Sequence, residues 1–309
     1  MIKSKNTLKN SVFLSTLAGF ALATSAHGAL LVYEGFDYGA ADTSRAGADL
    51  LHGQPDGVGG DGNATGLSGT WADSTNVQNT DLFMYSGSLG FGDLATSGNS
   101  VRSDTNNNND IMSRGITSTL DGSGELWFSF TANKLQNNFS AAEGGIAITN
   151  QTVGNPRIFE NDGTDGLQGF GIAPTTDGNN WTAHGWNGSS IVTGAESFGV
   201  ATNGSETNLL VGQIEFGAGT GGLDVFNLSY MDLMGGSTLA GGTLTAITSI
   251  EVDVDESTLD TLNLTRQVNT AYDEIRIGES FDDVVVAIPE PSIAILGSFG
   301  LLALLRRRR

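Results

Sequence analysis

The sequence contains no cysteine among its 309 residues. This absence excludes thiol catalysis, zinc–thiolate sites and iron–sulfur clusters, because each of these needs a cysteine sulfur. It also excludes disulfides, so an exported form must be stabilised by its packed core, with or without a bound metal. Proline is scarce, with five residues, whereas glycine is abundant, with 44. This balance is typical of a chain with many turns.

Basic residues are also few: the sequence has 14 Lys and Arg against 34 Asp and Glu, which gives a net charge of −20. Half of the basic residues lie at the two ends, at Lys3, Lys5, Lys9 and Arg306–Arg309. Without these and Glu290, seven basic residues remain against 33 acidic ones, a net charge of about −26. Such a body repels nucleic acid and anionic membranes and attracts cations. Solubility explains this charge, and calcium binding is the alternative.

The middle of the chain also lacks any stretch of ten residues with a clean helical period. Short apolar runs alternate instead with Gly, Asn, Asp, Ser and Thr, a pattern typical of many short strands. Residues 39–80 and 97–110 are expected to be loops, with Trp71 the one large anchor in the first. The expected strands span residues 30–36, 82–91, 125–131, 145–149, 167–173, 181–186, 208–216, 223–230, 247–254 and 271–277. We therefore predict an all-β fold, an antiparallel sandwich or jelly roll, in one domain.

The N-terminus has the three parts of a secretory signal peptide. Lys3, Lys5 and Lys9 form a basic region, residues 12–23 are mostly apolar, and Ala26-His27-Gly28 is a small-x-small cleavage site. A transmembrane helix is the weaker interpretation, because the apolar stretch is short. We predict a signal peptide over residues 1–28, a β-sandwich domain over 29–286 and a tail over 287–309.

The tail combines a rigid step, an apolar run and a basic end. Pro289 and Pro291 have no backbone N–H to continue a helix or a sheet, and Glu290 lies between them. Residues 293–305 carry no charge, but their number is below the roughly 20 residues that span a bilayer core. The residues Arg306, Arg307, Arg308 and Arg309 would stay on the cytoplasmic side. The physical pattern alone predicts a C-terminal transmembrane anchor.

This tripartite tail, with Pro289-Glu290-Pro291-Ser292, a short apolar helix and terminal arginines, resembles the PEP-CTERM sorting signal of Gram-negative bacteria. The resemblance implies recognition and cleavage near Pro-Glu-Pro by an exosortase, a membrane protease. It also implies an association with exopolysaccharide, biofilm or outer-envelope material. The partners would then be the secretion machinery and exosortase. The protein would be held transiently in the inner membrane before it reaches the outer envelope or the medium.

A second resemblance comes from the two ends of the body. Residues 31–38, Leu-Val-Tyr-Glu-Gly-Phe-Asp-Tyr, and residues 272–278, Tyr-Asp-Glu-Ile-Arg-Ile-Gly, are similar to the first and last strands of concanavalin A-like, laminin-G-like domains. This resemblance implies a jelly-roll sandwich whose terminal strands lie close together. Such domains often hold one Ca²⁺ at a loop rim.

The candidate catalytic segment is Glu251-Val252-Asp253-Val254-Asp255-Glu256. It resembles the Glu-x-Asp-x-x-Glu strand of laminarinase-type retaining β-glucanases. The resemblance implies Glu251 as nucleophile, Asp253 as its helper and Glu256 as acid/base, since paired carboxylates perform this chemistry. The alternative is a solvated acidic face on an alternating strand, with Ile250, Val252 and Val254 inside.

Two further kinds of site are predicted from composition. Carboxylates in Gly- and Asn-rich loops suit hard cations such as Ca²⁺; these are Asp56, Asp61, Asp104, Asp110, Asp162 and Asp165. Trp181, His184 and Trp186 form an aromatic cluster that could stack on a sugar ring. Because Trp181 and Trp186 are five positions apart on a strand, they face opposite sides, and at most one is exposed. Core packing of both is the alternative.

Three functions follow from these patterns. The first is a non-catalytic exported protein of the envelope or extracellular matrix that binds polysaccharide. The second is a secreted retaining polysaccharide hydrolase that uses Glu251 and Glu256. The third is a purely structural surface protein with neither activity nor affinity for a ligand.

Overall fold

The computed structural model describes residues 29–38, 50–54, 64–73, 82–102, 110–120, 124–134, 144–152, 158–160, 166–175, 180–195, 207–266 and 270–285. The predicted signal peptide and sorting tail lie outside these residues, and so do the helices expected in them. Within the described ranges, no helix is long and apolar enough to cross a membrane. The one described α-helix is α1, Phe281–Val285.

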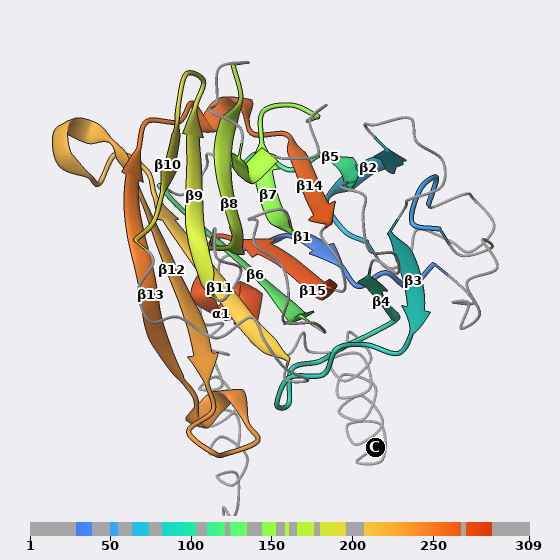
Figure 1. The fold of residues 1–309 in the computed structure, drawn as a ribbon. Coiled ribbons are helices and arrows are strands. Elements are labelled where there is room, and N and C mark those ends of the chain that lie inside the picture. The colour runs from blue at the N-terminus through green and yellow to red at the C-terminus, as the bar shows by residue number, and fades with distance from the viewer. Residues whose placement is uncertain are drawn as a thin grey trace, which may run out of the picture.

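Two antiparallel sheets pack face to face (Figure 1). Sheet A has the order β13-β12-β11-β6-β15-β4-β3, and β1 also pairs with β15. Sheet B has the order β10-β9-β8-β7-β14-β5-β2. The strands of sheet A are β1 (Leu30–Glu34), β3 (Phe83–Ser86), β4 (Asn99–Arg102), β6 (Glu125–Lys134), β11 (Asn208–Glu215), β12 (Asp224–Asp232), β13 (Thr243–Val252) and β15 (Thr270–Gly278). The strands of sheet B are β2 (Leu67–Asp73), β5 (Asp110–Ile116), β7 (Gly145–Thr149), β8 (Gln168–Pro174), β9 (Trp181–Asn187), β10 (Ile191–Thr193) and β14 (Thr261–Arg266). The prediction of an all-β antiparallel sandwich is confirmed.

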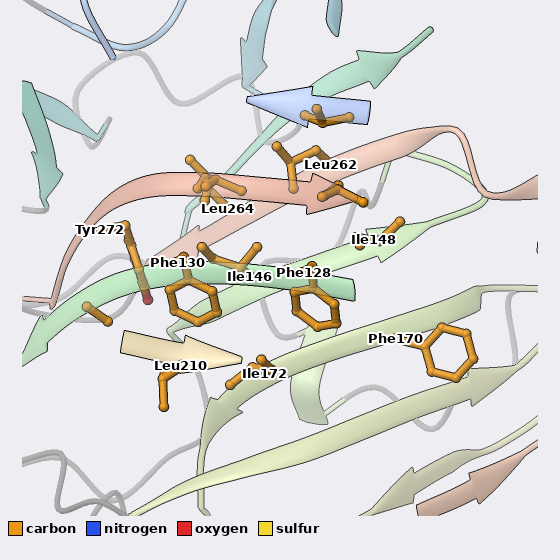
Figure 2. Packing of buried hydrophobic residues seen from close by; sticks show 14 of the residues in the cluster. Phe128, Phe130, Ile146, Ile148, Phe170, Ile172, Leu210, Leu262, Leu264 and Tyr272 are labelled. Atoms are coloured by element: carbon orange, nitrogen blue, oxygen red, sulfur yellow. The ribbon is translucent and has the colours of Figure 1, made fainter. Parts of the chain in front are cut away.

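The core between the sheets follows from strand alternation. Successive side chains on a strand point to opposite faces, so every second residue enters the core. On β6, Leu126, Phe128 and Phe130 are buried in this core, and on β14 Leu262 and Leu264 meet them from sheet B (Figure 2). Aromatic contacts tie the layers together, since the Phe130 and Trp181 rings have centroids 6.2 Å apart.

The first and last strands of the described body pair with each other. In β1 and β15, Tyr33 lies opposite Arg276 and Glu34 opposite Ile275. The expected proximity of the two terminal strands is confirmed. The predicted strands 208–216 and 223–230 are also found, and as β11 and β12 they pair as a hairpin from Leu210–Tyr230 to Glu215–Val225.

The loop predictions were wrong in two places. Trp71 is fully buried, as expected of an anchor, but it lies on strand β2 rather than in a loop. Within the predicted polar loop 97–110, residues 99–102 form β4 between β3 and β15. Strands β5, β10 and β14 were not predicted either. Strand β10 has three residues, β5 lacks apolar alternation, and β14 alternates only at Leu262 and Leu264 among Thr, Asn and Arg, so none gives a strong strand signal.

Both outer faces of the sandwich are covered in part. On sheet A, α1 and the segment around Leu94 cover an apolar layer that includes Val211 and Met231. On sheet B, the short 3-10 helix η1, Ile158–Glu160, packs over an apolar layer that includes Trp186. The second of these covered faces carries most of the polar residues discussed below.

Candidate binding face on sheet B

A row of small and polar residues crosses the outer face of sheet B. Residues that lie opposite one another in antiparallel strands share a face, so the strand register defines the row. Its members, one from each of six strands, are Thr193, His184, Gly171, Ala147, Asn263 and Ser113. Their sequence neighbours Phe170, Ile172 and Ile148 point the other way, into the core. The row is therefore built by residues that the core does not use.

Gly145 and Gly171 lie on this face, and because they have no side chains, a ring can approach their backbone closely. A Cβ atom on Gly145 would lie 2.8 Å from the ring of Phe159, and a Cβ on Gly171 would lie 2.7 Å from it. A larger residue at Gly171 would have to push the ring away, and one at Gly145 would also clash with the backbone oxygen of Ile172 at 2.3 Å. The two glycines thus form a shallow trough across β7 and β8, and the side chain of Phe159 lies in it, 4% exposed.

One wall of the trough is aromatic. The Phe159 ring centroid is 5.0 Å from that of His184 and 5.4 Å from that of Trp186. His184 and Trp186 are nearly parallel to each other, at 16°. Phe159 approaches His184 at 61°, the edge-to-face geometry that aromatic pairs favour.

The other wall is a chain of polar side chains. Ser113 Oγ donates to Asn263 Oδ1 at 2.6 Å, and Asn263 Nδ2 donates to Thr149 Oγ1 at 2.7 Å. Thr149 Oγ1 in turn donates to the backbone oxygen of Gln151 at 2.8 Å. Ser113, Asn263 and Thr149 are all buried, so these bonds satisfy groups that have little access to water.

The aromatic wall contains polar atoms that lack such partners. Among the residues that the structure describes, neither His184 Nε2 nor Trp186 Nε1 has a hydrogen-bond partner, and both are buried. His184 Nδ1 lies 3.3 Å from Thr193 Oγ1. Burial lowers the pKa of His184 to about 3, so the ring is neutral at neutral pH. An unpaired buried polar atom costs free energy, and both of these atoms lie on this face.

The predicted aromatic cluster is thus divided between two layers. Trp181 belongs to the main core between the sheets, whereas Trp186 packs on the outer face, so the prediction of opposite sides is confirmed. All three side chains are at most 1% exposed. The prediction of an exposed sugar-stacking platform is therefore corrected, because Trp181 is a core residue and Phe159 covers the other two rings.

The acidic segment 251–256 lies at the edge of sheet A. Ile250, Val252 and Val254 are buried, and Glu251 is exposed, so the predicted alternation is confirmed. The Glu251 carboxylate accepts hydrogen bonds from the backbone N–H of Thr220 at 3.2 Å and its hydroxyl at 3.3 Å. Glu256 begins the 3-10 helix η4, Glu256–Thr258. The proposed roles of Glu251, Asp253 and Glu256 stay a prediction.

The predicted calcium ligands cannot be placed. Asp56, Asp61, Asp104, Asp162 and Asp165 lie outside the described residues, and Asp110 begins β5 without a described side chain. In the described ranges, no three carboxylate or histidine side chains gather in a way that could hold a metal ion. A calcium site remains a prediction.

A buried ionic network that we did not predict lies between the sheets. Glu34 of β1 accepts hydrogen bonds from Arg114 at 2.9 Å, from Trp71 Nε1 at 3.2 Å and from the backbone N–H of Phe36 at 2.8 Å. The hydroxyl of Tyr38 donates to the same carboxylate. Burial raises the pKa of Glu34, and these hydrogen bonds oppose the rise. The network joins β1 of sheet A to β5 of sheet B.

A second network lies on the outer face of sheet A. Glu274 accepts from Arg276 at 2.9 Å, from Tyr33 at 3.1 Å and from the backbone N–H of Ser97 at 2.7 Å. Its neighbour Asp273 is also buried, and burial together with the charge of Glu274 raises the pKa of Asp273 to about 9. Glu274 has a φ of +53° and sits where the register between β15 and β6 shifts. This bulge places two successive carboxyl groups against the segment 88–97, where the backbone N–H of Leu89 donates to Asp273 and that of Ser97 donates to Glu274.

The comparisons with known proteins give no family for the chain. No family model matches it, and no curated protein matches it. Among solved structures, an endo-β-1,4-glucuronan lyase from the fungus Trichoderma reesei is 10% identical, with a TM-score of 0.43, over 83% of this chain and 98% of that one. The globular domain of T. cruzi calreticulin is 12% identical, with a TM-score of 0.45, over 69% and 85%. The lumenal domain of VIP36, bound to Ca²⁺ and Man3GlcNAc, is 11% identical, with a TM-score of 0.38, over 65% and 85%. With TM-scores below 0.5, these similarities say nothing about what this chain binds.

Proposed function

We propose that this protein is an exported β-sandwich that binds polysaccharide in the cell envelope or extracellular matrix through the outer face of sheet B. The observation that carries the proposal is the trough itself. It has a glycine floor, an aromatic wall with His184 and Trp186, and a polar wall with Asn263 and Thr149. A sugar ring has apolar faces and a polar edge, so it needs both kinds of wall.

Export and sorting are the second part of the proposal. The signal peptide over residues 1–28 and the tail over 287–309 support transport across the inner membrane and transient anchoring there. The Pro289-Glu290-Pro291 step and the terminal arginines support recognition and cleavage by an exosortase. The two terminal strands β1 and β15 pair with each other, which supports the concanavalin A-like class that the resemblance implies.

A retention experiment tests the binding part. The exported protein, as the cell processes it, is passed over insoluble and immobilised polysaccharides, including exopolysaccharide from the producing cells. We expect retention on at least one polysaccharide and weaker retention of the variant Asn263→Ala, which removes the centre of the polar wall. The matched control Asn227→Ala changes an asparagine on sheet A that bonds Glu215, and it should be retained like the parent. No retention of the parent on any polysaccharide would reject the binding function and favour a purely structural protein.

Mass spectrometry of the same material tests the sorting part. We expect the secreted form to begin at Ala29 and to lack Arg306–Arg309. An intact Arg309 in the extracellular form would exclude processing near Pro-Glu-Pro.

A further inference from the structure

The side chain of Phe159 occupies the trough as a ligand would. Its six-membered ring lies on Gly145 and Gly171 and against His184 and Trp186, but it belongs to a three-residue 3-10 helix rather than to the sheet. These contacts are all made by the ring. The trough therefore already accommodates a flat six-membered ring at close range.

Phe159 fills the trough but leaves polar atoms in it without hydrogen bonds. A phenyl ring fills the volume but offers no hydrogen bond to His184 Nε2 or Trp186 Nε1, two of the buried polar atoms that lack a partner in the described part of the chain. Trp186 Nε1 is a donor, and the second ring nitrogen of a neutral histidine either donates or accepts. A sugar ring is bulkier than a phenyl ring, but the hydroxyl groups on its edge can donate and accept and so can pair both atoms.

The charge of the trough indicates which kind of sugar fits. Its lining residues in the described ranges are Gly, Ala, Ser, Thr, Asn, Trp, a neutral His and the aliphatic residues Ile111 and Leu167, without a cationic group that could pair with a carboxylate or sulfate. The whole chain carries a net charge of −20, which repels anionic ligands further. A neutral hexopyranosyl ring is the class that this lining favours.

We propose that the trough is a subsite for a neutral hexopyranosyl ring and that Phe159 is its intramolecular occupant, which must leave before the sugar enters. This proposal rests on the proposed function and specifies its ligand and its control. A protein whose open state is populated only in part binds with an affinity lowered by that fraction. Removal of the occupant therefore raises the affinity for sugar without a new contact between protein and ligand.

Two phenylalanine variants test this proposal by isothermal titration with cellohexaose and laminarihexaose as the probes. Phe159→Ala empties the trough, and we expect it to bind one of these oligosaccharides at least about tenfold more tightly than the parent, which corresponds to an open state below about 10% in the parent. The matched control Phe170→Ala removes a buried phenylalanine from the core side of β8, the strand that carries Gly171, where it packs on Phe226 with centroids 5.6 Å apart. This control should bind no more tightly than the parent.

A conservative variant provides a test that does not depend on the stability of Phe159→Ala. Phe159→Leu keeps an apolar side chain in the trough but removes the ring, and we expect its affinity to lie between those of the parent and Phe159→Ala. In Phe159→Ala, the additional change Trp186→Phe removes the unpaired indole N–H and should reverse most of the gain. A hexamer of glucuronic acid, the anionic probe, should bind at least tenfold more weakly than the neutral hexamers.

The possible results separate the two proposals. Equal affinity of the parent, Phe159→Leu and Phe159→Ala for a neutral hexamer would leave the binding function intact and overturn the role of Phe159. Tighter binding of the anionic hexamer would overturn the assignment to a neutral ring. The absence of binding by every variant to any oligosaccharide, together with no retention of the parent on polysaccharide, would overturn both proposals.

Discussion

Arg114 and Glu34 form an ion pair of 2.9 Å that joins the two sheets, and the side chains are 4% and 0% exposed. The pair lies among Tyr38 and Trp71, both of which bond to the same carboxylate. A buried ion pair contributes little net stability compared with an apolar pair, but the loss of one partner leaves a buried charge uncompensated. The first strand of the body is therefore sensitive to changes in a residue 80 positions away.

The first prediction concerns this pair. We expect Arg114→Met to lower the free energy of unfolding by about 3–5 kcal/mol, because Glu34 would remain buried without its cation. Urea unfolding followed by circular dichroism measures the loss. The matched control is Arg102→Met, which removes a partly buried arginine that stacks 3.3 Å from the centroid of the Tyr85 ring. We expect the control to lose about 1 kcal/mol, and an equal loss in both variants would contradict the assignment.

The second prediction concerns His184 and acid. The folded-state pKa of His184 is about 3, below the ordinary value of 6.5, so the unfolded chain binds a proton first as the pH falls. Stability should therefore decrease between pH 6.5 and pH 3. We expect His184→Gln to show a shallower decrease in melting temperature over this range than the parent. His52→Gln, a change at an exposed histidine, should keep the slope of the parent.

The third prediction concerns Asp273 and base. Its folded-state pKa is raised to about 9 from an ordinary value of 3.8, so the folded protein keeps a proton that the unfolded chain has lost. The stabilisation is complete below about pH 4 and is lost as the pH rises through 9. We expect Asp273→Asn to make the free energy of unfolding less dependent on pH between 5 and 9.

The control for Asp273 is Asp255→Asn, at an exposed carboxylate. This variant should follow the pH dependence of the parent. Part of the slope should persist in Asp273→Asn as well, because burial also raises the pKa of Glu34 and Glu274. A slope in Asp273→Asn identical to that of the parent would mean that Asp273 is ionised in the folded protein.

The fourth prediction separates a surface carboxylate from a nucleophile. Glu251 is exposed and bonds Thr220, so Glu251→Gln should change the free energy of unfolding by less than about 0.5 kcal/mol. We expect no change in the rate of β-glucan hydrolysis, measured as release of reducing sugar, between the parent and this variant. Complete loss of a measurable activity at an unchanged melting temperature would instead assign Glu251 as the nucleophile of a glycoside hydrolase.

Much of the fold could be predicted from the sequence where apolar alternation is strong. Strand β6 and the hairpin of β11 and β12 are examples, because Leu126, Phe128 and Phe130 or Phe226 and Leu228 occupy every second position. Strands β5 and β14 were not predicted. Their outer faces carry Ser113 and Asn263, so their sequences look like turns although both strands are buried on two sides.

Only some residues of the candidate site could be identified from the sequence. His184 and Trp186 were identified as an aromatic pair, but nothing in the sequence connects them with Asn263 or Phe159. Gly169 and Gly171, two alternate residues of β8, were an available signal, since glycines on one face of a buried strand leave room for another group. That signal does not identify the side chain that packs against these glycines.

The sequence by itself determined the all-β class, the strongly acidic body, the absence of thiol chemistry and the two predicted targeting ends. These properties depend on composition and on patterns within about 20 residues, which the chain carries before it folds. The tertiary structure decided which residues meet: Arg114 with Glu34, Asp273 with Leu89, and Phe159 with Gly171. These contacts depend on strand order and register, which bring together residues far apart in the chain, and no local pattern encodes them.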